Sequence, residues 1–276
     1  SLKWEFRGSN NASGSLSKWI EWRSFFINEG TFDYKQRSLP QDTFSYYATK
    51  GPSVNRSVHQ LSFGIENERS LYPYKVVAQF QKAGDLLRTT VTSNYFFNYS
   101  VEQGISLRLF AGKIFYLQSK TDKIKYSNNR YYFTMYGPNG EDDYTYSNPF
   151  IERNQNTSFD SRQIMIRDGG FKYRSDFSSS QPGRTDNWMA ALNMAFDVPW
   201  KLNPLTILPF NIPLKVFTDI GTYAEAWKKN SSDPRFLYSM GLQISLLKYF
   251  NVYWVLLQSK QFKEPSELNG TKWWQK

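Results

Sequence analysis

The chain has 276 residues, and its 34 lysines and arginines against 24 aspartates and glutamates give a net charge of +10 at pH 7. It contains no cysteine and one histidine, which excludes disulfides, thiolate metal sites and any site that needs two histidines. No segment approaches about 18 consecutive apolar residues, so a transmembrane helix is excluded as well. The basic residues are dispersed. Solvated faces explain them most simply, a role at anionic lipid or in a charged lumen comes second, and nucleic acid comes last.

The N-terminal half consists almost entirely of strand patterns separated by turns and loops. Apolar and polar residues alternate with a period of two, which is typical of strands with one apolar face. Polar loops are predicted at 10–17 and 37–57, with a turn at 83–85. The predicted strands cover 1–8, 18–35, 57–68, 76–81, 89–99, 105–117 and 131–136.

The C-terminal half carries the clearest alternation. Residues 188–198, 214–221 and 236–247 place large apolar side chains on one face and small or polar ones on the other. Strands of about ten residues with this pattern fit the wall of a membrane barrel, with lipid outside and a polar lumen inside. Further strands are predicted at 163–167 and 249–258, and long loops at 172–187 and 222–235.

These patterns predict an all-β protein. The expected architecture is an antiparallel transmembrane β-barrel, or the C-terminal part of one, with roughly 10–12 strands in one domain that covers residues 1–276. Its long loops alternate with short ones, as external loops and periplasmic turns do. The chain starts at Ser1 without an initiator methionine and stops inside a strand-like run at Lys276, so we expect it to be a portion of a longer protein.

The sequence carries no catalytic motif. The single histidine, His59, lies on the same face of its strand as Leu61 and Phe63, and no nucleophile marks it as a base. The acidic run 141–143 lacks the ligand spacing of a calcium loop and is expected to be a solvated loop. No phosphate-binding glycine motif occurs. We therefore expect no metal and no cofactor in this chain.

A basic loop at 167–176 is the candidate functional segment. One interpretation is that an arginine of this loop folds into the lumen and pairs with a carboxylate on the wall, because a buried charge needs a partner. Asp197 and Asp219 are the candidate partners, since each lies opposite in parity to the apolar residues of its strand. The alternative is an ordinary basic loop. The candidate lumen residues are Arg167, Gly169, Gly170, Phe171 and Arg174.

Residues 187–221 resemble the C-terminal strands of Omp85-type (surface antigen) outer-membrane barrels. Phe196-Asp197-Val198-Pro199 is similar to a strand ending of that family, and Phe217-Thr218-Asp219-Ile220-Gly221 is similar to its Phe-x-Asp-x-Gly strand. The loop at 167–174 lies where the family carries an Arg-Gly-Phe/Tyr lumen loop, although the order here is Arg-Asp-Gly-Gly-Phe. The resemblance implies the outer membrane of a Gram-negative bacterium, with the lipid bilayer as partner.

A second resemblance, over 163–250, is to the C-terminal region of large envelope M1-family metallo-aminopeptidases of Gram-negative bacteria. It rests on the segments 163–171, 185–188, 212–217 and 219–227. In such proteins a zinc peptidase domain precedes a barrel-like region. The zinc motif is absent here, so the resemblance implies a membrane anchor whose catalytic domain and zinc belong to an upstream part of the polypeptide.

Three functions remain open. The first is an outer-membrane barrel portion that anchors an envelope aminopeptidase, with the upstream domain and other envelope proteins as partners. The second is an Omp85-type insertion or translocation barrel that acts on client strands at an edge. The third is a soluble all-β module that binds glycans or single-stranded nucleic acid through aromatic side chains. Aromatic residues recur on nearly every strand, which favours two membrane interfaces over one binding surface, and no nucleic acid partner is expected.

Overall fold

The structure is a computed structural model. It describes residues 1–8, 16–39, 43–100, 103–119, 131–139, 142–145, 147, 153, 159–174, 182–209, 212–246 and 250–263. Within these residues no helix is long and apolar enough to cross a membrane.

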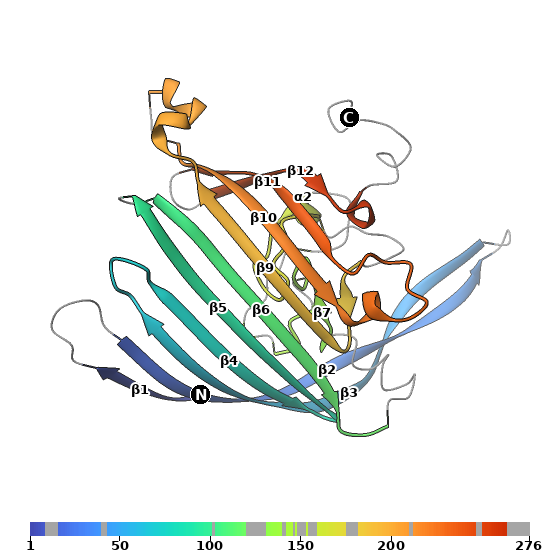
Figure 1. Cartoon of the computed structure of the whole chain (residues 1–276). Coiled ribbons are helices and arrows are strands. Elements are labelled where there is room, and N and C mark those ends of the chain that lie inside the picture. The colour runs from blue at the N-terminus through green and yellow to red at the C-terminus, as the bar shows by residue number, and fades with distance from the viewer. Residues whose placement is uncertain are drawn as a thin grey trace.

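Ten strands form one antiparallel sheet, which confirms the all-β prediction. Each strand pairs with its neighbour in the chain, with one exception. β6 pairs directly with β9, and the intervening strands β7 and β8 form a separate two-stranded sheet. Figure 1 shows the large sheet as a strongly curved trough. Its strands are β1 (Leu2–Gly8), β2 (Leu16–Leu39), β3 (Thr43–Asn67), β4 (Tyr74–Ala83), β5 (Leu86–Ser100), β6 (Gln103–Tyr116), β9 (Trp188–Asp197), β10 (Leu214–Tyr223), β11 (Leu237–Leu246) and β12 (Phe250–Gln258).

The sheet is antiparallel, as predicted, and the strands described here do not close into a barrel. The strands β1 and β12 stand at the two ends of the strand order and are not paired with each other. Closure requires every strand, including the first and the last, to find a partner on both sides. The ten strands described here curve strongly but leave one free edge on each side.

The segment between β6 and β9 folds back onto the concave face of the sheet. Figure 1 shows β7 and α2 on the inner side of the trough. Phe133 of β7 pairs with Thr185 of β8. The short elements are β7 (Phe133–Thr134), α2 (Phe159–Arg162) and β8 (Arg184–Thr185), with the 3₁₀ turns η3 (Trp200–Leu202), η4 (Pro204–Ile207), η5 (Ala224–Trp227) and η6 (Lys260–Phe262) elsewhere.

Three local predictions are wrong. The polar segment 37–57 is not a loop, because β2 and β3 continue through it as a long hairpin paired from Leu16 and Asn67 to Leu39 and Thr43. Backbone pairing extends along the hairpin whatever the side chains on its two faces, so the polar composition of the segment did not reveal it. Pro52 is accommodated where the register shifts and where β4 no longer pairs with β3. The strand predicted at 131–136 shortens to β7, and 163–167 is irregular and follows α2.

The core lies between the concave face and the inserted segment. Phe110 of β6 and Met189 of β9 are fully buried beneath Phe133, Met135 and Phe171. The rings of Phe110 and Phe133 lie 5.7 Å apart in an edge-to-face arrangement. Burial of each such side chain contributes about 1.5–3 kcal/mol, so this apolar layer stabilises the insert against the wall.

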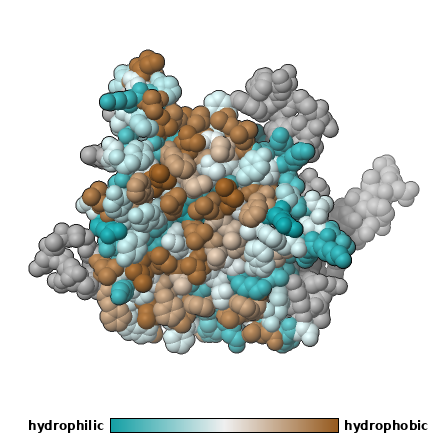
Figure 2. All heavy atoms as spheres, viewed as in Figure 1, coloured by the Kyte–Doolittle hydropathy of each residue, from teal (hydrophilic) through white to brown (hydrophobic). Residues whose placement is uncertain are grey.

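The convex face is apolar and exposed. The antiparallel register aligns side chains of the same parity, so that Leu192 of β9 lies beside Leu109 of β6 and Ile220 of β10. Figure 2 shows the resulting apolar surface, in brown, across the strands of this face. Its exposed large side chains include Leu2, Trp4, Phe6, Trp22, Leu61, Phe63, Ile65, Phe80, Val91, Phe97, Leu109, Phe196, Ile220, Tyr238, Met240, Val252 and Trp254.

Candidate functional site

A row of polar side chains crosses the concave face. The strand register places residues of one parity side by side on successive strands, and here this parity carries charged and amide groups instead of apolar ones. Buried polar groups need partners. The inserted segment supplies them for Asn193 and Asp219, whereas Lys75 pairs with Glu66 of β3 and Arg108 with Asn193 of β9. The row consists of Lys75, Asn94, Arg108, Asn193, Asp219 and Ser239, on β4, β5, β6, β9, β10 and β11.

Asp219 is fully buried and is bound by residues 163–174, which we call the inner loop. Lys172 Nζ lies 2.5 Å from Asp219 Oδ1, and the Lys172 backbone N–H donates to Asp219 Oδ2 at 3.1 Å. Asn193 Nδ2 donates to Asp219 Oδ1 at 2.9 Å. Three donors therefore hold the carboxylate, which is the arrangement that a buried charge requires.

A second buried ion pair joins the inner loop to the wall with the charges reversed. Arg88 of β5 donates through Nη2 to Asp168 Oδ1 at 2.7 Å, and both side chains are 8% exposed. The Arg88 guanidinium also lies 4.4 Å from the centre of the Phe133 ring. Asp168 has a φ of +47°, a left-handed conformation that aspartate tolerates better than most residues. This turn directs the carboxylate toward β5.

The two glycines of the inner loop allow close approach to the wall. The Gly169 carbonyl accepts from Asn193 Nδ2 at 2.9 Å. A Cβ on Gly169 would lie 2.5 Å from the backbone oxygen of Met135. Gly170 has a φ of +63°, and a Cβ there would lie 2.8 Å from Arg108 Nη1. A larger residue at Gly169 would push the loop away from Met135 of the inserted segment, and one at Gly170 would crowd Arg108 of the wall.

Aromatic packing fixes the far end of the loop. Phe171 is fully buried, and its backbone N–H donates to the Met135 carbonyl at 2.9 Å. Tyr173 stacks on Phe262 of η6 with ring centres 3.9 Å apart. Burial raises the pKa of Tyr173 well above its usual value, so this phenol stays neutral. Gly221 of β10 leaves the space that Met135 and Phe171 occupy.

The structure brings together part of the predicted set. Asp219, Gly169, Gly170 and Phe171 all lie at the contact between inner loop and wall, but the cation on Asp219 is Lys172 and not an arginine. Arg174 ends the described part of the loop and is half-buried. The side chain of Arg167 makes no hydrogen bond or ion pair with the residues that the structure describes, and its Nη1 is buried.

Asp197 has a different role from the predicted one. It lies 3.0 Å from Lys215 Nζ and accepts from the Gly104 backbone N–H at 2.9 Å, so it joins β9 to its neighbouring strands. Sequence reasoning missed Lys172, Arg88 and Arg108. Arg88 and Arg108 lie in strands, at the parity opposite to the apolar residues, and that parity is the signal that could have found them.

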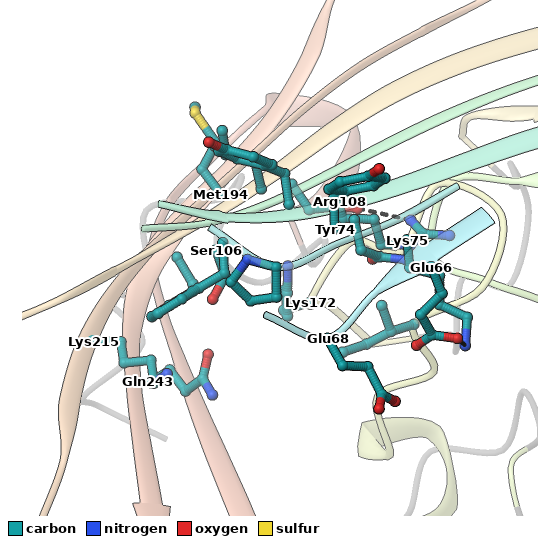
Figure 3. Close-up of a pocket in the computed structure, with 18 of the residues that line it drawn as sticks. Glu66, Glu68, Tyr74, Lys75, Ser106, Arg108, Lys172, Met194, Lys215 and Gln243 are labelled. Atoms are coloured by element: carbon teal, nitrogen blue, oxygen red, sulfur yellow. Dashed lines mark hydrogen bonds and ion pairs between the residues drawn. The ribbon is translucent and has the colours of Figure 1, made fainter. Parts of the chain in front are cut away.

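Two cavities adjoin the inner loop. The larger, of about 530 Å³, is lined by residues of β3 to β6, of β9 to β12 and of the inner loop; Figure 3 shows Lys75, Arg108 and Lys172 among its side chains. The smaller, of about 300 Å³, contains Arg88, Arg108 and Arg167 in its lining. Asn94, Arg108 and Ile166 line both cavities, which therefore adjoin.

No metal centre is found among the described residues. They contain no group of three His, Cys, Asp or Glu side chains that could hold a metal ion. His59 Nδ1 and Ser24 Oγ form a hydrogen bond of 3.0 Å. Asp142 and Asp143 accept hydrogen bonds from nearby backbone N–H groups, and Glu141 lies outside the described residues.

Comparison with known proteins gives no relative. No protein-family model matches the chain, and no curated protein matches it. The functional reasoning therefore rests on the sequence and on the geometry given above.

Proposed function

We propose that this chain is part of the wall of an outer-membrane β-barrel and anchors a larger envelope protein. The observation that carries the proposal is the apolar convex face, which crosses the sheet from β1 to β12 and leaves large side chains exposed. Contiguous exposed apolar surface of this extent is rare on soluble monomers. Lipid is the occupant that suits a face made mainly of large apolar side chains, with one short polar row of Ser24, His59 and Lys82 across β2 to β4. The opposite face holds the buried charges.

The inner loop supports the assignment of the concave face to the inside of a barrel. It joins the wall through two buried ion pairs, Arg88 with Asp168 and Lys172 with Asp219, and through apolar packing. Charges buried in this way belong to the interior of a barrel, where lipid cannot reach them. In this proposal the loop occupies the lumen side of the barrel wall.

The family assignment within this proposal rests on Asp219. This residue is the aspartate of the Phe-x-Asp-x-Gly strand that resembles the Omp85 type, and Lys172 of the inner loop binds it. The inner loop contains the sequence segment that resembles that family's lumen loop. We infer an Omp85-related barrel on this basis. An upstream M1-type zinc aminopeptidase domain is proposed from the sequence resemblance alone.

A second candidate is an Omp85-type insertion or translocation barrel. The observation that favours it is the pair of free edges at β1 and β12, because an unpaired edge offers backbone groups to an incoming strand. It differs from an anchor in one measurable respect. An insertion barrel would form crosslinks to client strands along an edge, whereas an anchor would not.

The test of the membrane proposal is partition of the expressed chain between buffer and detergent, followed by gel mobility with and without heating. We expect a detergent-dependent species whose mobility changes on heating, and quenching of its tryptophans by brominated lipid after reconstitution. A monodisperse β protein in buffer alone would overturn the proposal and place the soluble binding module first.

A further inference from the structure

We propose that the smaller cavity beside the inner loop binds an oxyanion of the phosphate type. Three guanidinium groups line this cavity of about 300 Å³, namely Arg88 from β5, Arg108 from β6 and Arg167 from the inner loop. Asp168 is the single carboxylate among the described residues of the lining. The other polar lining side chains are neutral: Gln79, Thr90, Thr92 and Asn94.

The three arginines are incompletely paired. Asp168 neutralises Arg88, whose Nε remains buried without a hydrogen-bond partner among the described residues. Arg108 donates to the neutral Asn193 Oδ1 at 2.8 Å and forms no ion pair within the same residues. Burial lowers the pKa of Arg108 even though the nearby carboxylates of Asp168 and Asp219 act in the opposite direction. Arg167 has a buried Nη1 without a partner. Partly buried cations without a counterion are costly, and a bound anion would remove that cost.

The adjoining larger cavity differs in the pairing of its lysines. Its three lysines each have a carboxylate partner: Lys75 with Glu66, Lys172 with Asp219 and Lys215 with Asp197. The excess positive charge is therefore concentrated in the smaller cavity. The larger cavity, which shares Arg108 and Asn94 with it, provides space through which an anion can arrive.

The ligand chemistry follows from the lining. Guanidinium groups present planar pairs of N–H donors that match the oxygens of phosphate, and threonine hydroxyls and the Asn94 amide can donate to the same group. A volume of about 300 Å³ accepts a phosphate ion or a phosphate monoester headgroup. Free phosphate and the phosphate of a lipid headgroup share this chemistry, and the experiment below separates them. The inference does not depend on the membrane proposal.

The test uses the folded full chain and measures the thermal midpoint and the affinity for inorganic phosphate, with chloride at matched ionic strength as reference. The variant is Arg167→Gln, because the buried Nη1 of that side chain has no hydrogen-bond partner to lose. The matched control is Arg162→Gln, which removes one positive charge at an exposed residue of α2. Phosphate should stabilise the wild type and the control, and Arg167→Gln should weaken phosphate binding about tenfold or more.

Two further readouts make the outcome decisive. Without phosphate, Arg167→Gln should be as stable as the wild type or more stable, since it removes an uncompensated cation; a clear loss of stability would indicate a structural arginine and overturn the proposal. Short-chain phosphatidic acid in place of free phosphate tests the lipid source, against phosphatidylcholine as control. A response to phosphatidic acid alone assigns the site to a lipid phosphate. No response to either, or an equal response from Arg167→Gln, overturns the site.

Discussion

Lys172 and Asp219 form a buried ion pair across the interface between the inner loop and β10, with 2.5 Å between Nζ and Oδ1. The backbone N–H of Lys172 donates to the same carboxylate at 3.1 Å. The pair is almost inaccessible to solvent, with side chains 6% and 0% exposed. One residue of the loop therefore contributes both a charge and a backbone donor, which fixes the position of the loop along the strand.

Replacement of Lys172 by Met should destabilise the folded chain by about 3–5 kcal/mol, because it leaves the Asp219 carboxylate buried and without its cation. Denaturant-dependent loss of heat-modifiable mobility measures the effect. In the double variant Lys172→Met with Asp219→Asn, much of the loss should be recovered, since the unpaired charge is gone. If the loss in the double variant equals the sum of the losses in the two single variants, the result contradicts a coupled pair.

Replacement of Gly169 by Ala should displace the inner loop. The new Cβ would lie 2.5 Å from the Met135 oxygen and 2.6 Å from the Met135 Cα, and backbone cannot move aside as a flexible side chain can. We expect a loss of about 1–3 kcal/mol in the free energy of unfolding. Gly30→Ala is the control, because nothing lies within 4 Å of a Cβ there. Equal stability of the two variants would refute the close approach.

The stability of the insert should fall in strong alkali because of Tyr144. Burial raises the pKa of Tyr144 to about 12, although the nearby Arg88 acts in the opposite direction. The unfolded phenol ionises near pH 10, so the stabilisation is complete below that pH and is lost as the pH rises from about 10 to about 12. The expected loss is about 2–3 kcal/mol. Tyrosinate absorbance measures the titration.

Tyr144→Phe is the matched variant for this experiment, since it removes the ionisable group and the hydrogen bond to Gln81. Its unfolding free energy should change less between pH 10 and pH 12 than that of the wild type. An unchanged alkaline profile would assign the titration to another buried tyrosine, with Tyr136 the first candidate because burial raises its pKa to about 12 as well.

A new charge should destabilise the protein much more on the convex face of the sheet than on the concave face. Leu109 is 52% exposed on the convex face of β6, whereas Ser106 on the same strand lines the larger cavity. Leu109→Lys should destabilise the reconstituted protein by about 2–4 kcal/mol if the residue lies near the middle of the bilayer, and Ser106→Lys should cost much less. Folding yield into vesicles gives the comparison. A tolerated lysine at 109 would count against lipid contact.

The alternation of apolar and polar residues was sufficient to predict much of the sheet. The alternation in 188–198, 214–221 and 236–247 predicts β9, β10 and β11 to within a few residues, because adjacent side chains of a strand point to opposite faces whatever the strand pairs with. The same rule placed Asp219 on the inner face. It also placed Asp197 opposite the apolar residues, but it could not say that Asp197 would bind Lys215 and the Gly104 backbone.

Only the tertiary structure decided which charges meet and whether the sheet closes. Arg88 and Asp168 are separated by eighty positions in the chain, so their contact depends on where the insert lies and not on any local pattern. Polar strands such as the ends of β2 and β3 form through backbone hydrogen bonds, which alternation does not report. The sequence by itself determined the faces of the strands, since that property is local. Pairing at the edges and burial of charge are long-range properties, and folding in three dimensions determined them.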